Sequence, residues 1–83
     1  AAQRLDPKMI WAVMGRESSG NPNALSHKNA RGLMQVVPAT GAAIARQLAL
    51  PGYVDGSSLY DPDMNIAIGS AYWVRLTERF LSA

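Results

Sequence analysis

The sequence predicts one small all-α domain, and three observations support this prediction. Apolar residues recur at helical spacing in three separate segments, an Asp-Pro pair precedes two of them, and no segment shows the alternating apolar pattern of a β-strand. A chain of 83 residues is too short for more than one domain. Hydrophobic residues make up 48% and charged residues 17%, which fits a compact globular unit and excludes a charge-rich disordered tail.

The first helix is predicted to begin at Asp6-Pro7. Asp6 is a good N-cap, and Pro7 suits the first helical position because its missing N–H needs no partner there. One face of this helix is defined by residues at helical spacing, namely Ile10, Val13, Met14 and Glu17. Residues 18–32 are rich in Ser, Asn, Gly and Pro without a period of their own, and they are predicted to form a structured loop.

Two more helices are predicted further along the chain. One covers residues 40 to about 48, and its inward positions are Ala42, Ile44, Ala45 and Leu48. The longest follows Asp61-Pro62, and its inward positions are Ile66, Gly69, Tyr72 or Trp73, Leu76 and Phe80. Glycine costs about 1 kcal/mol relative to alanine inside a helix. We therefore expect Gly69 to allow a close approach by another helix or backbone.

Composition argues against several classes of site. Eight Lys and Arg against six Asp and Glu give a net charge of +2, which is too small to indicate nucleic-acid binding, and no nucleic-acid partner is expected. Without cysteine, disulfides and thiolate metal sites are excluded. His27 is a single loop imidazole with no second ligand at metal spacing, so neither a metal nor a cofactor is expected.

Glu17 does not fit the apolar face to which the periodicity assigns it. A carboxylate near a helix C-terminus meets the negative potential of unpaired carbonyls, and burial would disfavour its charged form as well. Both effects raise the proton affinity, as a general acid near neutral pH requires. The alternative is a glutamate at a frayed helix end, turned to solvent or paired with Arg16 or Arg31.

Three ordered motifs carry a resemblance to a known family. They are Glu17-Ser18, Gly32-Leu33-Met34-Gln35, and Asn65-Ile66 followed by Gly69 and Tyr72. They resemble the ES, GLMQ and N-I-x-x-G-x-x-Y motifs of the soluble lytic transglycosylase catalytic domain, and the resemblance spans residues 5 to about 80. It implies a small lysozyme-like helical domain. Within the third motif, Asn65 is expected to brace the first turn of the last helix, and Tyr72 to lie in the core.

The resemblance implies an enzyme that cleaves the β-1,4 bond between N-acetylmuramic acid and N-acetylglucosamine in peptidoglycan glycan strands. The family forms a 1,6-anhydromuramoyl product. Glu17 is implied as the single catalytic residue, first protonating the leaving oxygen and then taking the proton of the C6 hydroxyl. No obvious second carboxylate is present. Capping explains Asp6, Asp61 and Asp63 at helix starts, while Asp55 lies in a turn-rich loop and Glu78 late on the final helix.

Further residues are implied to bind substrate or orient the acid. Ser26 stands where the family places a serine near the catalytic acid, the alternative being a loop serine bound to local backbone. The amide of Gln35 can donate to and accept from sugar groups. Gly32 and Met34 are also implied to bind substrate or orient the acid. Met34 and Leu33 are expected to form part of the core or of the groove wall.

Two departures from the family pattern stand out. Val37 occupies a groove position where the family often has Met, and this smaller wall is expected to change sugar packing more than proton transfer. Family domains also continue to an A-Y-N-A-G-like motif, whereas this chain ends at Ala83. Residues 1–83 are therefore interpreted as a partial SLT-type catalytic domain: a fragment, a domain whose missing helix another chain or segment supplies, or an incomplete and inactive one.

Other functions stay open at this stage. One is a non-catalytic module that binds glycan strands or serves a secretion, conjugation or virion assembly, and another is a lysozyme-type hydrolase. A helical partner-binding segment that matches the motifs by accident is the third. The implied location is the periplasm or cell envelope, or alternatively a phage virion.

Overall fold

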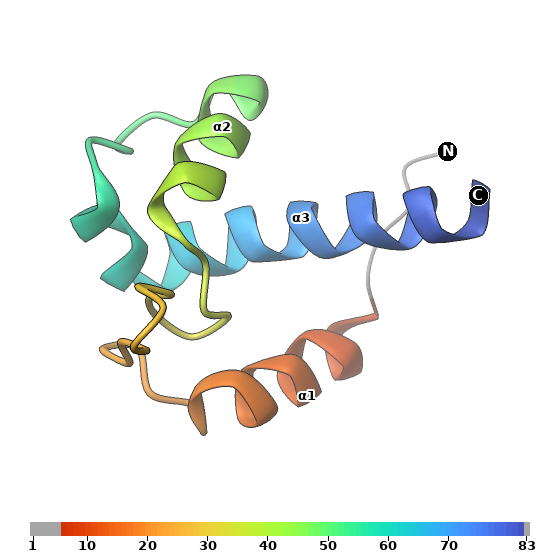
Figure 1. The fold of residues 1–83 in the computed structure, drawn as a ribbon, viewed down its shortest axis with the longest axis horizontal. Helices are drawn as coiled ribbons and strands as arrows, with labels where there is room; N and C mark the ends of the chain where they lie inside the picture. The colour runs from red at the N-terminus through yellow and green to blue at the C-terminus, as the bar shows by residue number, and fades with distance from the viewer. Residues whose placement is uncertain (1–5, 83) are drawn as a thin grey trace.

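The computed structural model describes the backbone of residues 6–82 and the side chains of residues 6–79 (Figure 1). This part of the chain holds three α-helices, α1 (Pro7–Ser18), α2 (Pro38–Leu48) and α3 (Pro62–Ser82), and one 3-10 helix, η1 (Gly56–Tyr60). It contains isolated β-bridges in the loop after α1 but no strand. The predicted all-α class is confirmed.

Two of the helix starts form as the sequence predicts. The Asp6 side chain accepts a hydrogen bond from the Lys8 N–H at 2.8 Å, and the Asp61 side chain accepts one from the Asp63 N–H at 2.9 Å. Each contact satisfies a backbone N–H that has no partner inside its helix. Helix α2 begins at Pro38 rather than at residue 40, because proline suits a first turn in which the N–H is not needed.

The core lies where α2, η1 and α3 pack together with the segment that precedes α2. Its buried hydrophobic residues are Met34, Val36, Ile44, Ala45, Leu59 and Ile68. Leu59 is fully buried although it lies in η1, a short helix in the turn-rich segment between α2 and α3. Leu48 was expected to face inward but is 46% exposed, because the buried positions of α2 end at Ala45 and the last turn extends past the core.

Helix α3 crosses the core, and several residues in its first half are buried there. Asn65, Ile68 and Gly69 are buried, whereas Ile66 is only half-buried, so the buried face is rotated from the predicted one. A Cβ at Gly69 would lie 2.8 Å from the Met34 Cβ, which confirms that this glycine permits a close approach. The approaching group is a side chain rather than a backbone. The Phe80 side chain lies outside the described residues.

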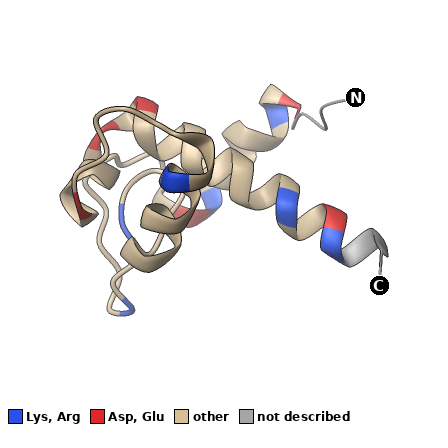
Figure 2. Ribbon diagram, turned by 90° about the horizontal axis from the view of Figure 1, so that it is seen from above, with Lys and Arg blue, Asp and Glu red and all other residues tan. Residues whose placement is uncertain are grey.

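Helix α1 is an outer element that joins the core through one side. None of its residues is buried, although Ile10, Val13 and Met14 pack against the core. In Figure 1, α3 runs between α2 and α1, and the segment between α1 and α2 closes one end. Lys, Arg, Asp and Glu are distributed over helices and loops (Figure 2). No helix within residues 6–82 combines the length and hydropathy that membrane crossing requires.

Candidate active site

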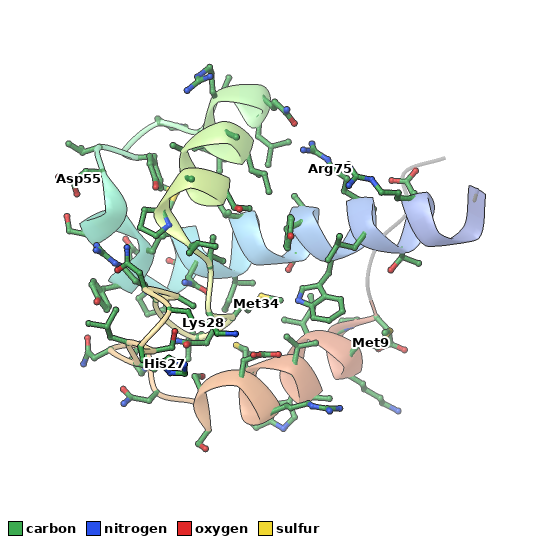
Figure 3. The ribbon with its side chains drawn as sticks, viewed as in Figure 1. Met9, His27, Lys28, Met34, Asp55 and Arg75 are labelled. Atoms are coloured by element: carbon green, nitrogen blue, oxygen red, sulfur yellow. The ribbon has the colours of Figure 1, made fainter. Side chains whose placement is uncertain are left out.

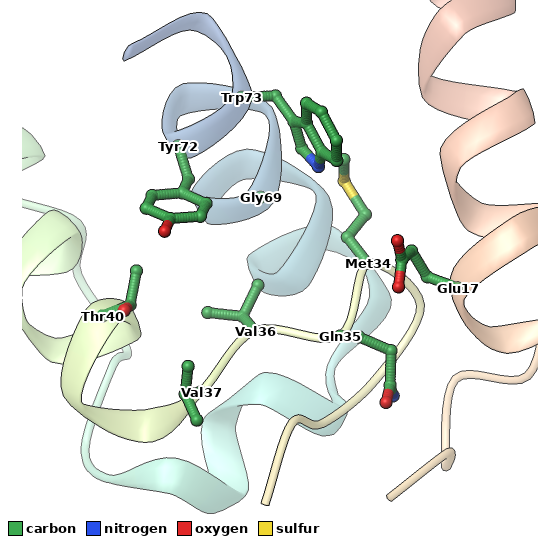
Figure 4. Close-up of a pocket in the computed structure, with 9 residues that line it drawn as sticks. All are labelled: Glu17, Met34, Gln35, Val36, Val37, Thr40, Gly69, Tyr72 and Trp73. Carbon is green, nitrogen blue, oxygen red and sulfur yellow. The ribbon is translucent and has the colours of Figure 1, made fainter. Parts of the chain in front are cut away.

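A cavity of about 190 Å³ lies between the end of α1, residues 34–37, the first turn of α2 and the middle of α3 (Figure 4). Its walls combine apolar surface with a few polar groups, which is the usual composition of a ligand site. The lining residues are Glu17, Met34, Gln35, Val36, Val37, Thr40, Gly69, Tyr72 and Trp73. The first and second motifs of the sequence therefore meet at one cavity, together with part of the third.

The Glu17 side chain points from α1 toward the segment that carries Met34 and Gln35 (Figure 4). It is exposed, so the expectation that this carboxylate is buried is wrong. The periodicity located the correct helix face, but α1 covers the core too loosely to bury any residue. Glu17 forms no hydrogen bond or ion pair with another described residue, and the alternative pairing with Arg16 or Arg31 is not observed.

Residues 31–36 form a tight loop whose two ends pair with each other. The Arg31 N–H donates to the Val36 carbonyl at 2.9 Å, and the Val36 N–H donates to the Arg31 carbonyl at 3.0 Å. Gly32 and Gln35 both have positive φ, at 78° and 53°. A left-handed backbone is costly for a residue with a side chain, so the surrounding contacts hold Gln35 in this conformation.

Asn65 clamps this loop from α3. Its Oδ1 accepts from the Met34 N–H at 2.7 Å, and its Nδ2 donates to the carbonyls of Arg31 and Leu59, both at 2.8 Å. The side chain is 0% exposed. The structural role expected for Asn65 is confirmed, but its partners are the 31–36 loop and η1 rather than the first turn of α3.

Gly32 serves the packing of the loop. A Cβ there would overlap the Asn65 side chain and the Leu59 carbonyl, so no other residue fits. Gly32 does not line the cavity, whereas Met34 does while being 4% exposed. Figure 3 shows the Met34 side chain between α1 and α3. The prediction that Met34 is a core residue is confirmed, and Met34 also lines the cavity. Substrate roles for Met34 and Gly32 stay predictions.

Gln35 lines the cavity and is tied to the loop through one end of its amide. Its Nε2 donates to the carbonyls of Gly32 at 3.0 Å and Ala24 at 3.3 Å. Its Oε1 has no hydrogen bond among the described residues, so this oxygen is available to accept from a sugar hydroxyl or acetamido N–H.

Ser26 is occupied within its own turn. Its Oγ accepts from the N–H groups of Lys28 and Ala30, both at 3.1 Å, and the residue does not line the cavity with Glu17. This geometry matches the alternative of a loop serine bound to local backbone. The role of Ser26 in orienting the acid stays a prediction.

The cavity is also lined by Tyr72, Thr40 and Trp73, which were not predicted as site residues. Tyr72 is 37% exposed and borders the cavity, so its expected core position is wrong. Neither its hydroxyl nor that of Thr40 has a hydrogen bond among the described residues. Trp73 borders this cavity and a second one of about 480 Å³, which Glu17 also borders. The sequence contained one signal for two of these residues. Tyr72 and Trp73 both lie near the predicted inward face of the last helix, and the periodicity did not decide between them.

The groove position occupied by Val37 does line the cavity, as expected from the resemblance. Of the described residues in this lining, Glu17 alone carries a carboxylate. No group of three metal-ligating side chains occurs in the described part of the chain. The cavity thus offers one acid, one amide oxygen and two hydroxyls against an apolar wall, a set suited to proton transfer and hydrogen bonding on a neutral polar ligand.

Shifted pKa values occur away from this cavity, near η1. Burial raises the pKa of the Tyr53 hydroxyl, and the nearby Asp55 charge adds to the effect. The pKa of Asp55 is lowered, mainly because the Ser57 hydroxyl donates to its carboxylate and also because the Ser57 N–H does so. These residues do not line the cavity, so the shifts concern local structure rather than the site.

Comparisons with known proteins agree with this architecture. The Transglycosylase SLT domain matches residues 1–83. The 70 kDa soluble lytic transglycosylase SLT70 from Escherichia coli is similar, with a TM-score of 0.82 and 33% identity over 93% of this chain and 13% of that chain. Its complex with bulgecin A gives a TM-score of 0.83 at 33% identity, with the same coverage of 93% and 13%.

A third similar structure is an inactive glutamate-to-glutamine mutant of lytic transglycosylase Slt from Pseudomonas aeruginosa. Its TM-score is 0.84 and its identity 32%, over 92% of this chain and 12% of that chain. The chain therefore spans only a small part of these relatives, while its own length is matched almost completely. By this match, over all of residues 1–83, the chain belongs to the Transglycosylase SLT domain family.

Proposed function

We propose that this domain is the catalytic part of a peptidoglycan lytic transglycosylase. It cleaves the β-1,4 bond between N-acetylmuramic acid and N-acetylglucosamine and releases a 1,6-anhydromuramoyl end. The observation that carries the proposal is the single carboxylate of Glu17 in a cavity that also holds Gln35, Thr40 and Tyr72. Hydrolytic glycosidases ordinarily need two carboxylates on either side of the scissile bond, so one carboxylate favours a reaction in which the sugar supplies its own nucleophile.

The proposed reaction has two proton transfers through one group. Protonated Glu17 gives its proton to the glycosidic oxygen as the C1–O bond breaks, and the N-acetylglucosamine unit leaves as an alcohol. The resulting Glu17 carboxylate then takes the proton of the C6 hydroxyl while that oxygen bonds to C1. Glu17 ends protonated, as it began, and no water is consumed. The absence of any hydrogen bond from Glu17 to a described residue leaves both carboxylate oxygens available for these steps.

The cavity walls suit a neutral glycan. Val36, Val37 and Trp73 offer apolar surface to the C–H groups of a sugar ring. The Gln35 Oε1 and the hydroxyls of Thr40 and Tyr72 have no partner among the described residues, so each can bind a sugar hydroxyl or acetamido group without breaking a contact of the fold. This arrangement supports a substrate held by hydrogen bonds and apolar contact rather than by charge.

The comparisons support the proposal at the level of the family. The inactive form of the Pseudomonas aeruginosa relative carries glutamine in place of glutamate, which is the change expected to remove a general acid. The bulgecin A complex is of a lytic transglycosylase as well. Because the relatives are bacterial lytic transglycosylases, the proposed place of action is the periplasm or cell envelope.

Cleavage in heavy-oxygen water tests the reaction type. The full-length protein that carries this domain is incubated with purified sacculi, and the released muropeptides are analysed by mass spectrometry. The proposal expects anhydromuramoyl ends that contain no heavy oxygen, because water does not attack C1. Reducing ends that carry heavy oxygen would instead identify a lysozyme-type hydrolase, and glycan binding without any released product would identify a non-catalytic module.

A further inference from the structure

The last turn of α1 is joined to the 31–36 loop by one side chain. The Ser18 Oγ lies 2.9 Å from the Met14 carbonyl oxygen, within its own helix, and 2.8 Å from the Leu33 carbonyl oxygen. Ser18 is half-buried at this contact. Among the described residues, no other hydrogen bond connects α1 to residues 31–36.

The serine hydroxyl has a single proton, so it donates a three-centre hydrogen bond to the two carbonyl oxygens. The Met14 carbonyl also accepts from the Gly20 N–H at 3.2 Å. The Leu33 carbonyl has no other donor among the described residues. Loss of the hydroxyl would therefore leave the loop carbonyl without its donor while the end of α1 kept its backbone contacts.

Little else fixes α1 against the loop. The helix buries no residue, and its contact with the core consists of the half-buried apolar side chains of Ile10, Val13 and Met14. Apolar contacts are weakly directional, so they tolerate small sliding of the helix. Glu17 itself has no hydrogen bond to any described residue. The position of its carboxylate over the cavity thus follows the position of the helix end.

The loop, in contrast, is held at several points. Asn65 binds the Met34 N–H, the ends of the loop pair with each other, and the Gly32 N–H donates to the Ala24 carbonyl at 2.8 Å. Leu33 lies between Gly32 and Met34 in this rigid segment, next to residues that line the cavity. The Leu33 carbonyl is therefore a fixed reference point against which the end of α1 can be set.

From this geometry, and resting on the proposed function, we propose that Ser18 is a positioning residue for Glu17. Its hydroxyl holds the last turn of α1 on the Leu33 carbonyl, which sets the distance between the Glu17 carboxylate and the glycosidic oxygen. The rate of proton transfer depends strongly on this distance, and a displacement of about 1 Å can lower the rate about a hundredfold. Ser18 forms no hydrogen bond with the side chains proposed to bind the glycan in its ground state, which are Gln35, Thr40 and Tyr72.

The test compares Ser18→Thr with Ser18→Val in the full-length protein. The two variants have the same shape and the same branching at Cβ, and they differ in a hydroxyl against a methyl group. Values of kcat and KM are measured with a soluble glycan-chain fragment of peptidoglycan. The temperature is chosen well below the unfolding transition of both variants, as followed by circular dichroism, so that a loss of stability alone leaves kcat unchanged.

The inference expects Ser18→Thr to keep kcat within about threefold of the wild-type value, and Ser18→Val to lower kcat by about ten- to a hundredfold with KM nearly unchanged. Equal kcat values for the two variants, or a loss in Ser18→Val that lies in KM alone, would overturn it. If the wild-type protein cleaves glycan strands while these variants behave alike, the positioning role fails and the proposed function stands. If the wild-type protein releases no product, both fail.

Discussion

The Met34 N–H donates to the Asn65 Oδ1 at 2.7 Å, and this contact joins α3 to the loop that lines the Glu17 cavity. The Asn65 amide uses its two N–H groups on the carbonyls of Arg31 and Leu59 as well. One buried side chain thus fixes the positions of the loop, η1 and α3 relative to one another. The site depends on this clamp because Met34 and Gln35 follow the loop backbone.

Replacing Asn65 by leucine should destabilise the protein by about 2–4 kcal/mol, because the buried Met34 N–H and Leu59 carbonyl lose their partners. The free energy of unfolding is measured by urea denaturation. Asn23→Ala is the matched control, since the Asn23 side chain is exposed and has no hydrogen bond among the described residues. It should change stability by less than about 0.5 kcal/mol. Similar losses in the free energy of unfolding for both variants would contradict the role of Asn65 in holding the loop.

Two glycines in helices should respond to alanine in opposite directions. Gly69→Ala places a Cβ 2.8 Å from the Met34 Cβ and 2.6 Å from its sulfur, and overpacking of this kind costs about 1–3 kcal/mol. Gly15→Ala meets nothing within 4 Å, and it should stabilise the protein by up to about 1 kcal/mol through helix propensity. Thermal unfolding of the two variants shows whether each substitution lowers or raises the stability of the protein. A stabilising Gly69→Ala would mean that Met34 moves aside freely.

Local sequence signals predicted the helices well. Asp6-Pro7 and Asp61-Pro62 carry both a cap and a proline for the first turn, so the starts of α1 and α3 depend on neighbours in the chain and could be found without tertiary information. Helix η1 could not. Leu59 is one apolar residue in a turn-rich segment, and its full burial follows from α2 and α3 closing around it.

The candidate site could be predicted only in part. The motifs brought Glu17, Met34 and Gln35 together correctly, but the helical period could not tell that Glu17 is exposed. Periodicity identifies a face, whereas burial depends on how much of the fold covers that face. For the same reason Tyr72 was assigned to the core, while the structure leaves it at the edge of the cavity.

The unpartnered hydroxyls of Thr40 and Tyr72 should matter for glycan binding and not for folding. Tyr72→Phe and Thr40→Val should each lower kcat/KM on glycan strands by about two- to twelvefold, the worth of one hydrogen bond, with the unfolding temperature nearly unchanged. Tyr53→Phe is the reverse control. It removes a hydrogen bond from the Tyr53 hydroxyl to the Pro38 carbonyl at 3.3 Å, so it should lower stability without changing KM. Loss of stability in Tyr72→Phe would show a structural role instead.

The lowered pKa of Asp55 makes a small pH-dependent contribution to stability. A folded-state pKa below the ordinary value of 3.8 means that this contribution is present above pH 3.8 and is lost as the pH falls through the folded-state pKa. Ser57→Ala removes the hydroxyl donor and should raise the Asp55 pKa toward 3.8, which an NMR titration of the carboxyl carbon measures. Ser70→Ala should leave this titration unchanged, because the Ser70 hydroxyl forms its one hydrogen bond among the described residues with the Met34 sulfur.

The most direct test of the central claim is the rate of anhydromuropeptide release by Glu17→Gln in the full-length protein. Glutamine keeps the shape of the side chain but cannot exchange a proton with the sugar, so release should fall by roughly 10² to 10⁴-fold. Glu78→Gln, at an exposed position of α3 that does not line the cavity, should retain the wild-type rate. Wild-type release by Glu17→Gln would contradict the claim that one carboxylate carries both proton transfers.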